Sequence, residues 1–430
     1  MPTKVQSHNS IFGITWNSIL ALMVVLVILV IVILFIVFTA QPAQGQTFQV
    51  IYNFAGGPDG AWPNGMTIDA AGNLFGTAGG GGHAGNGTVF ELARRGSGWI
   101  FIPLYNFLGG TDGATPFARP NFGSDGALYG TTSAGGGSGC SQGSGCGTVY
   151  KIMPSAHPVP AVAGGWTESV LYRFHGSDGN AIFGDVKLDR QGNVYGTAYD
   201  GGTNPQCGLV YELLPAGGNW TEKIIHNFTD RGDDGCNPPA GVVLDEAGNL
   251  YGVTVAGGTN QFGVIFRLAP SGTSWNYTAL YSLEGSDGLS PEGGLIFDQV
   301  NNLYGTAAND FNGDGGTVFA ISASGGNWIF SLLYKLPGHG VYGPTDRLAI
   351  DTAGNLYGTT YQDGAYGYGS IFKLAPSDGT WIYTDLHDFT GGSDGSNPFG
   401  GVTLDGNGVL YGTATSGGRY GGGSIWQITP

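Results

Sequence analysis

Asn73-Leu74-Phe75-Gly76-Thr77 is the first of seven copies of one short sequence motif, and the spacing of the copies predicts the fold. The second residue of the motif recurs, at intervals of 53 to 66 residues, as Leu128, Val194, Leu250, Leu303, Leu356 and Leu410. Self-similarity at such a period is the sequence signature of repeat proteins, whose units pack against one another. Because no linker-like stretch interrupts the units after residue 46, we expect one repeat array rather than several domains.

Each repeat contains four short runs that are typical of β-strands. In the unit that begins at Trp220, these runs are residues 220–228, 241–245, 249–254 and 263–268, separated by turns rich in Gly, Asp and Pro. No helical periodicity appears after residue 46. Seven units of four antiparallel strands predict an all-β, seven-bladed β-propeller over residues 47–430. The short Gly-preceded run is expected innermost and the Trp-led run outermost.

The two ends of the repeat region predict how the ring closes. Residues 47–54 are a copy of the outer strand and precede any inner strand. Residues 424–429 are a copy of the fourth run of the unit and lack an outer partner. Pairing of these two segments would complete the seventh blade. Because strands alternate in direction, the outer-to-inner connections and the Gly-Gly loops are expected on the same face of the ring.

An apolar segment near the N-terminus predicts a membrane anchor. Residues 19–40 carry no charge, and a helix of this length matches the roughly 30 Å hydrocarbon core of a bilayer. We therefore expect one transmembrane helix over residues 19–40, a short cytoplasmic N-terminus over residues 1–18 and a linker over residues 41–46. The alternative is a long signal sequence that is cleaved, with secretion of the repeats. Both predict a repeat region outside the cytoplasm, and the first predicts a single-pass protein of the cell membrane.

The charge of the repeat region argues against a polyanionic partner. All thirty-one Asp and Glu residues follow residue 46, against fourteen Lys and Arg, a net charge of about −17. Such a field repels nucleic acid, so we expect no nucleic-acid partner.

The four cysteines fit an oxidising compartment. Cys140 and Cys146 share one Gly/Ser-rich loop, and Cys207 and Cys236 lie at the two ends of one strand-plus-loop unit. No Cys-x-x-Cys or His-x-x-x-His spacing occurs, which argues against zinc. We expect two disulfides.

Acidic residues recur in two places of the repeat. Six of the seven outer-to-inner loops carry an Asp-Gly pair, with His339-Gly340 in the sixth unit; the acids are Asp59, Asp112, Asp178, Asp234, Asp287 and Asp394. Asp-Gly forms turns, because the carboxylate accepts backbone hydrogen bonds and Gly adopts positive φ. A ring of carboxylates on one face could instead bind sugar hydroxyls or cations. A second set of acids ends the inner strands and is predicted to form hairpin turns.

One loop resembles the first half of a calcium-binding loop. Asp310, Asn312 and Asp314 alternate before Gly315, a spacing that lets their oxygens converge on a hard cation. The twelfth position, where a bidentate Glu is expected, holds Ile321. Calcium is therefore a candidate metal at this loop, and no other cofactor is expected.

The repeat resembles the GloVer tandem-repeat family of bacterial surface proteins. The matching segments include Leu171-Tyr172-Arg173-Phe174, Gly176-Ser177-Asp178-Gly179, Asn355 to Thr359 and Gly147-Thr148-Val149-Tyr150, and the likeness covers residues 48–430. Members of this family look like exported proteins that various anchors hold at the cell envelope. The resemblance implies no catalytic residues, since the family has no established activity.

These observations favour a non-enzymatic role. No Gly-x-Ser-x-Gly elbow, phosphate-binding loop or His-Glu-x-x-His motif occurs. We expect a membrane-tethered propeller that binds or scaffolds a glycan, an envelope component or another protein through the face with the long loops. One alternative is an enzyme on that face that acts on polysaccharide or oxidises a sugar. Another is a purely structural coat component. A catalytic site would require off-pattern polar residues clustered on one or two blades.

Overall fold

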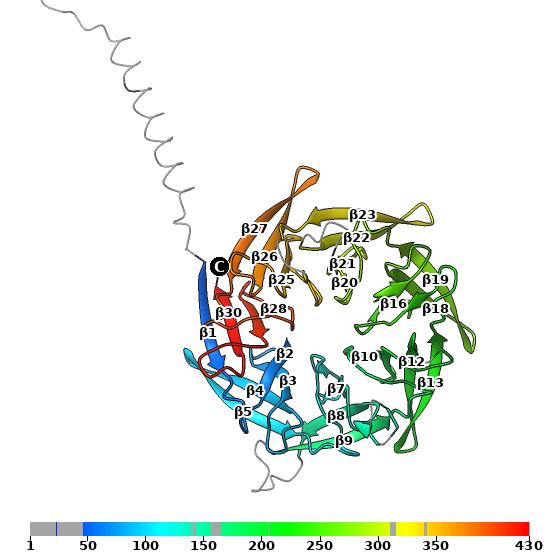
Figure 1. The fold of residues 1–430 in the computed structure, drawn as a ribbon, viewed down its shortest axis with the longest axis horizontal. Coiled ribbons are helices and arrows are strands. Elements are labelled where there is room, and N and C mark those ends of the chain that lie inside the picture. Colours follow the sequence, from blue (N-terminus) through cyan, green and yellow to red (C-terminus); the bar gives the residue numbers. More distant parts are fainter. Residues whose placement is uncertain are drawn as a thin grey trace, which may run out of the picture. The chain divides into compact units, whose positions relative to one another are not determined.

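Seven four-stranded antiparallel sheets stand around a common axis in the computed structural model (Figure 1). The structure describes residue 23 and residues 46–137, 139–140, 143–155, 165–204, 206–309, 315–338 and 342–429. The predicted all-β, seven-bladed propeller is confirmed. All but one position of the candidate membrane segment, residues 19–40, lies outside the described residues. Within the described part, no helix is long and apolar enough to cross a membrane.

Six of the seven blades are built from neighbouring segments of the sequence, and in most blades the shortest strand lies at the axis (Figure 1). From the axis outward, the first blade contains β2 (Ala61–Ile68), β3 (Leu74–Gly80), β4 (Thr88–Arg95) and β5 (Gly98–Asn106), and the second contains β6 (Asn121–Phe122), β7 (Leu128–Thr132), β8 (Thr148–Pro154) and β9 (Trp166–Arg173). The third blade contains β10 (Lys187–Leu188), β11 (Val194–Ala198), β12 (Leu209–Ala216) and β13 (Asn219–Asn227), and the fourth contains β15 (Val243–Leu244), β16 (Leu250–Thr254), β18 (Val264–Ser271) and β19 (Ser274–Ser282). The fifth blade contains β20 (Ile296–Phe297), β21 (Leu303–Ala307), β22 (Thr317–Ser324) and β23 (Asn327–Lys335), and the sixth contains β24 (Ala349–Ile350), β25 (Leu356–Thr360), β26 (Ser370–Ser377) and β27 (Thr380–Asp388). A small extra sheet pairs β14 (Gly235–Cys236) with β17 (Ala256–Gly257).

The seventh blade combines the two ends of the ring. It contains β28 (Val402–Leu404), β29 (Leu410–Ala414) and β30 (Ser424–Thr429), and its outermost strand is β1 (Thr47–Asn53). β1 pairs antiparallel with β30, from Thr47 opposite Thr429 to Asn53 opposite Ser424. Just after β1, the fully buried Phe54 packs in a core cluster with residues of the first and the seventh blade. This pairing closes the ring and gives β30 the outer partner strand that it would otherwise lack.

The glycine of the repeated motif is needed because an aromatic ring on the next strand occupies the space of a side chain. Gly252 of β16 pairs with Phe266 of β18, and a Cβ atom at Gly252 would lie 2.6 Å from Cζ of that ring. This separation is far below a van der Waals contact, so glycine is needed beneath the ring. The equivalent rings of the other blades are fully buried: Phe90, Tyr150, Tyr211, Phe319, Phe372 and Trp426.

Neighbouring blades pack through a second set of aromatic contacts. In five blades the Trp near the start of the outer strand lies against the aromatic ring of the repeated motif in the blade before it. Trp275 of β19 lies 6.1 Å, centroid to centroid, from Tyr195 of β11, and Trp328 of β23 lies 5.7 Å from Tyr251 of β16. The outer-strand Trp residues therefore belong to the interfaces between blades.

Two blades replace an aromatic pair by a tyrosine and a glutamate. In the first blade Phe90 of β4 packs against Phe101 of β5, with ring centroids 5.3 Å apart. The second blade carries Tyr150 and Glu168 at these two positions, and both the Tyr150 hydroxyl and Glu168 Oε1 are buried without a hydrogen bond to a described residue. Burial, reinforced by the charge of Asp112, raises the pKa of Glu168 to about 8. The third blade has the same replacement, with Tyr211 and Glu222.

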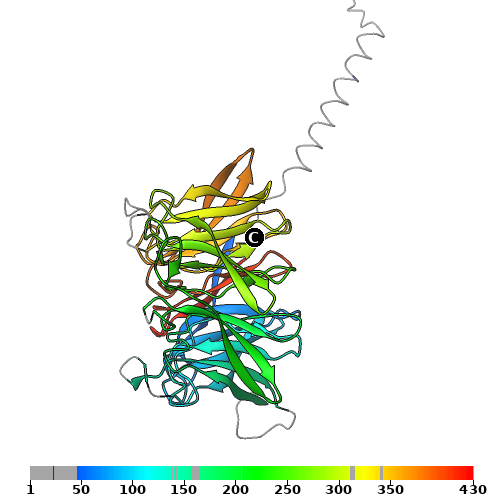
Figure 2. The same cartoon turned by 90° about the vertical axis from the view of Figure 1, so that its right-hand side faces the viewer.

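Viewed from its edge, the ring has strands running from one face to the other, with loops gathered along the faces (Figure 2). One face carries the outer-to-inner connections together with the loops that follow the second strand of each blade. These two kinds of loop pair with each other in several blades, as at the isolated bridges Asn180–Asp200, Leu289–Asn309 and Ser396–Ser416. We call this the long-loop face.

Candidate functional site

The six Asp residues of the Asp-Gly pairs form turns on the long-loop face. Asp178 accepts hydrogen bonds from the backbone N–H of His175 at 2.6 Å and from the Tyr172 hydroxyl at 2.7 Å. Asp234 accepts one from the backbone N–H of Thr229 at 2.9 Å. Equivalent backbone bonds are made by Asp59, Asp112, Asp287 and Asp394. These carboxylates hold their own loops to the outer strand, and a ligand role for the six stays a prediction.

The acids at the inner-strand ends form the predicted hairpin turns. Asp245 accepts bonds from the backbone N–H groups of Ala247 and Asn249, at 2.9 and 2.8 Å, and from the Tyr251 hydroxyl at 3.0 Å. The second blade, which lacks an Asp at that position, uses Asp125 for the same purpose. Much of the acidity of the chain thus stabilises turns.

The proposed calcium loop cannot be placed, because Asp310, Asn312 and Asp314 lie outside the described residues. Among the residues that the structure describes, no group of three His, Cys, Asp or Glu residues could hold a metal ion. Calcium at residues 310–314 therefore stays a prediction.

Both predicted disulfides are present, and both brace loops of the long-loop face. Cys140 bonds Cys146 within the second blade. Cys207 bonds Cys236, which ties a loop of the third blade to the outer-to-inner connection of the fourth. Next to this bond, Asn237 donates hydrogen bonds to backbone oxygens across the same junction, one of them 3.0 Å from the oxygen of Tyr199.

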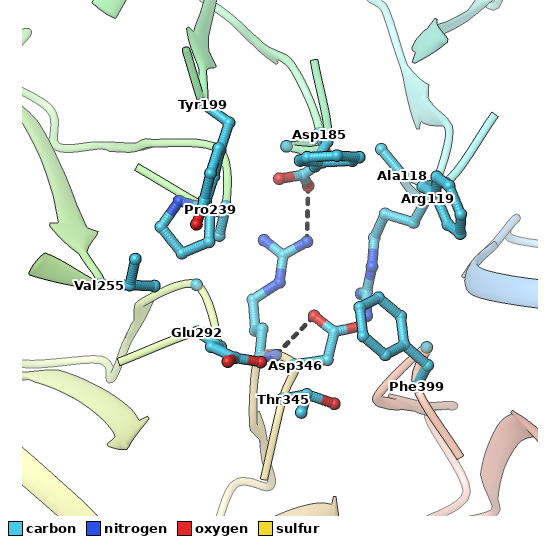
Figure 3. A pocket seen from close by; sticks show the side chains of 18 of the residues that line it. Ala118, Arg119, Asp185, Tyr199, Pro239, Val255, Glu292, Thr345, Asp346 and Phe399 are labelled. Carbon is cyan, nitrogen blue, oxygen red and sulfur yellow. Dashed lines mark hydrogen bonds and ion pairs between the residues drawn. The ribbon is translucent and has the colours of Figure 1, made fainter. Parts of the chain in front are cut away.

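A cavity of about 470 Å³ lies where the outer-to-inner connections meet. Six of the seven blades contribute to it, through residues 117–119, 183–185, 239–241, 345–347 and 399–400 and through Ser290, Glu292 and Gly294 (Figure 3). We call it the axial cavity. None of the six turn-forming Asp residues of this face is among its described lining residues. The ring of carboxylates and the cavity are therefore separate features of one face.

The residues that distinguish this cavity stand at one position of the repeat. This position lies four residues before the acid that ends the inner strand, or before Gly123 in the second blade, and it holds Gly in four of the seven blades, namely Gly65, Gly241, Gly294 and Gly401. The same position holds Arg119 in the second blade, Asp185 in the third and Arg347 in the sixth. Sequence reasoning missed these residues, although an alignment of the units at the end of the inner strand would have revealed them.

An ion pair spans the axis at this position. Arg347 Nη2 lies 2.7 Å from Asp185 Oδ2, and the two side chains are 18% and 17% exposed (Figure 3). Asn121 Nδ2 donates a second hydrogen bond to the same carboxylate oxygen at 2.9 Å. Burial alone would raise the pKa of Asp185, but the charges of Arg347 and Arg119 and the Asn121 bond outweigh it and lower that pKa. The pair therefore stays ionised and joins the second, third and sixth blades.

Arg119 lies beside this ion pair without sharing it. Its side chain runs into the cavity next to Asp346 (Figure 3). Its Nη2 atom is buried and makes no hydrogen bond to a described residue. Burial and the like charge of Arg347 lower the pKa of Arg119 to about 10, although Asp346 and Asp185 act in the opposite direction.

Two further carboxyl groups of the cavity are destabilised in their charged form. Burial raises the pKa of Asp346, against the charges of Arg119 and Arg347, and burial also raises the pKa of Glu292. The Asp346 carboxylate accepts a hydrogen bond from the backbone N–H of Arg347 at 2.6 Å. The cavity thus combines cations with acids that hold protons more tightly than usual.

Aromatic rings follow one another around part of the cavity mouth. Phe117 lies 5.9 Å from Phe183 and 6.5 Å from Phe399, measured between ring centroids. Phe183 and Phe399 are 39% and 37% exposed. The contacts continue from Phe183 to Tyr199 at 5.7 Å, and from Phe399 to Tyr361, which lies behind the lining residues, at 6.0 Å. We call these five rings the aromatic arc.

Together these features define a seven-bladed β-propeller of tandem repeats, with an axial cavity of ligand size on its long-loop face. The chain belongs to the Gloeobacter/Verrucomicrobia repeat family, whose pattern matches residues 36–163, 138–349 and 276–430. This confirms the resemblance seen in the repeats. No curated protein matches the chain in sequence.

Solved structures of other propellers share the architecture at low identity. PorZ, an essential bacterial surface component of the type-IX secretion system of Porphyromonas gingivalis, is 13% identical, with a TM-score of 0.51, over 88% of this chain and 48% of its own. An ulvan lyase is 10% identical, with a TM-score of 0.48, over 86% and 94% of the two chains. The aldose sugar dehydrogenase of Streptomyces coelicolor is 12% identical, with a TM-score of 0.42, over 90% and 99%. Likeness at this level reflects a shared fold and not a shared function.

Proposed function

We propose that this protein is a membrane-tethered, extracytoplasmic propeller that binds a carbohydrate in its axial cavity. The observation that carries the proposal is the aromatic arc bordering a floor of charged side chains. A sugar ring presents apolar C–H faces, which pack on aromatic rings, and hydroxyl groups, which need hydrogen-bond partners. Phe117, Phe183 and Phe399 supply the first kind of contact, and the Arg347–Asp185 pair supplies the second.

The size of the cavity supports this proposal. Small-molecule sites usually occupy about 300–1,000 Å³ and combine mostly apolar walls with a few placed polar groups. The axial cavity, at about 470 Å³, falls within that range. Its opening on a face rather than in a closed core would let a sugar of a longer polymer enter while the rest of the chain runs across the loops.

The proposed location rests on the cysteines and the N-terminal segment. Both cysteine pairs form disulfides, and the structure has no free cysteine in its described part. Disulfides persist in oxidising compartments and are rare in the cytosol. Together with the uncharged residues 19–40, they support a repeat region held outside the cell membrane, with secretion after cleavage as the alternative.

Binding to a glycan array tests the proposal. The full chain, purified in mild detergent, is compared with the Phe183→Ala/Phe399→Ala double variant, for which we expect at least a tenfold loss of affinity for any glycan retained by the wild type. The matched control is Ile100→Ala/Ile382→Ala, which truncates two exposed apolar side chains on outer strands away from the cavity. Equal binding by the aromatic double variant and the control would contradict the proposal.

A second candidate function, polysaccharide cleavage or sugar oxidation, is favoured by the acids of the cavity. A carboxyl group with a raised pKa can act as a general acid near neutral pH. Asp346 and Glu292 have that property, and both line the cavity. Release of products from a bound polymer, abolished by Asp346→Asn or Glu292→Gln with binding retained, would favour this candidate. Binding without turnover would favour the first.

A further inference from the structure

We propose that the axial cavity selects acidic sugars, and that the Arg119 guanidinium binds the sugar carboxylate. This inference rests on the proposed carbohydrate-binding function and specifies its ligand class. It is carried by the hydrogen-bond state of Arg119 and by the way the surrounding charges are already used.

Arg119 has donor capacity that the described protein does not use. A guanidinium has five N–H donors arranged in a planar fork. Arg119 Nη2 is buried and makes no hydrogen bond to a described residue. A buried donor without a partner is costly, and such groups are rare in folded proteins. A carboxylate that accepts two parallel hydrogen bonds from the fork would satisfy it.

The nearby acids are engaged elsewhere. Asp185 is held by Arg347 and Asn121, with donor–acceptor distances of 2.7 and 2.9 Å to one oxygen. Asp346 Oδ1 accepts the backbone N–H of Arg347 at 2.6 Å. Asp346 also balances part of the Arg119 charge, but burial favours its protonated form. A ligand carboxylate would therefore add a partner that the cavity itself does not fully supply.

The backbone of the first blade leaves room for Arg119. A Cβ atom at Gly65 would lie 2.9 Å from Cβ of Arg119 and 3.4 Å from its Nε atom. Gly65 stands four residues before Asp69, as Arg119 stands four residues before Gly123, so the first blade has a glycine at this repeat position. The Arg119 side chain therefore lies against the backbone of Gly65, where the first blade has no side chain of its own.

Cations gather here against the charge of the whole protein. The chain has fifteen Lys and Arg residues and a net charge of −16. Arg119 and Arg347 meet at the axis, and burial together with their charges lowers the pKa of the neighbouring Lys187. Because Asp185 already neutralises Arg347 and burial favours the protonated form of Asp346, Arg119 and Lys187 leave a local excess of positive charge that attracts an anion, where solvent screening is reduced. The adjoining rings of Phe117 and Phe399 can pack on the apolar face of the sugar that carries the anionic group.

The test compares acidic polysaccharides with neutral forms of the same linkage. Oligosaccharides of polygalacturonate, alginate and hyaluronan are used alongside their carboxyl-reduced counterparts, in titrations with the full chain in detergent. We expect the wild type to bind at least one acidic oligosaccharide at least tenfold more tightly than its reduced form. In Arg119→Gln this ratio of dissociation constants should fall at least tenfold, and its dependence on salt should weaken.

Two further variants make the result specific. Arg190→Gln removes the same charge from an exposed hairpin turn between β10 and β11, and it should leave the ratio unchanged. Arg119→Lys keeps the charge and the aliphatic stem but not the planar fork, so an intermediate ratio is expected. If Arg119→Gln does not fold, as judged by its melting curve, Arg119→Lys decides.

The outcomes separate this inference from the proposed function. Equal binding of acidic and reduced forms, with no effect of either Arg119 variant, would overturn the acidic-sugar inference and leave carbohydrate binding intact. Binding of neither form, on this panel and on the glycan array, would overturn both. An acid preference that Arg190→Gln reduces as much as Arg119→Gln would show attraction by overall charge and overturn the role of Arg119.

Discussion

Replacing Glu168 by Gln should remove a pH dependence from the stability of the propeller. Glu168 lies beside the buried Tyr150 hydroxyl, at a position where the first blade has Phe101, and burial raises its pKa from 4.5 to about 8. The folded protein therefore holds this proton up to about pH 8, whereas the unfolded chain releases it near pH 4.5. Because unfolding releases a proton within this window, the free energy of unfolding contributed by Glu168 falls as pH rises through it.

The magnitude follows from the two pKa values. Each pH unit between them corresponds to about 1.4 kcal/mol, or roughly 5 kcal/mol for the whole window. Glu168 is only partly shielded from water, and solvent screening reduces the effect, so we expect about 2 kcal/mol. Gln is neutral at every pH and resembles the protonated acid in shape. Glu168→Gln should thus be about 2 kcal/mol more stable than wild type at pH 8 and nearly equal to it at pH 4.5.

Urea unfolding followed by tryptophan fluorescence measures this difference. Midpoints are compared at pH 4.5, 6.5 and 8 for the wild type, for Glu168→Gln and for Glu246→Gln, which removes an exposed acid from a hairpin turn. The control should follow the wild type at each pH. If the stability of Glu168→Gln falls between pH 4.5 and 8 as steeply as that of the wild type, the reasoning about the buried acid is refuted.

Three further predictions concern the ring itself. Gly252→Ala should cost about 1–3 kcal/mol, because its Cβ would collide with the ring above it, whereas Gly406→Ala, which faces open space, should be nearly neutral; urea midpoints of the two variants test this. Deletion of residues 47–54 should lower the melting temperature by roughly 10 °C or more, since the seventh blade loses its outer strand; an unchanged melting curve would contradict the closure. Replacing Cys207 and Cys236 together by Ala should cost about 2–4 kcal/mol by relaxing a loop closed over 29 residues, and equal midpoints for this variant and reduced wild type would attribute the effect to that bond.

The sequence repeat predicts the fold, but it does not predict which residues form the candidate site. Positions that every blade needs, such as Asp245 in its hairpin and Asp178 in its turn, recur in the sequence and prove to form backbone hydrogen bonds. Binding residues need not recur, because a single ligand on the axis can be contacted by a different residue from each blade. Arg119, Asp185 and Arg347 are visible in the sequence as departures from glycine at one repeat position, but a departure alone does not indicate what it faces.

The order of strands, the number of blades and the pairing of the two chain ends follow from the sequence by itself, because period, turn residues and alternation are local and repeated seven times. Only the tertiary structure decided that Arg347 meets Asp185 from a position 162 residues away, and that Arg119 is left beside them with an unused donor. Those relations depend on the closure of the ring, which brings the second, third and sixth blades to a common axis. Spacing along the chain does not record distance across that axis.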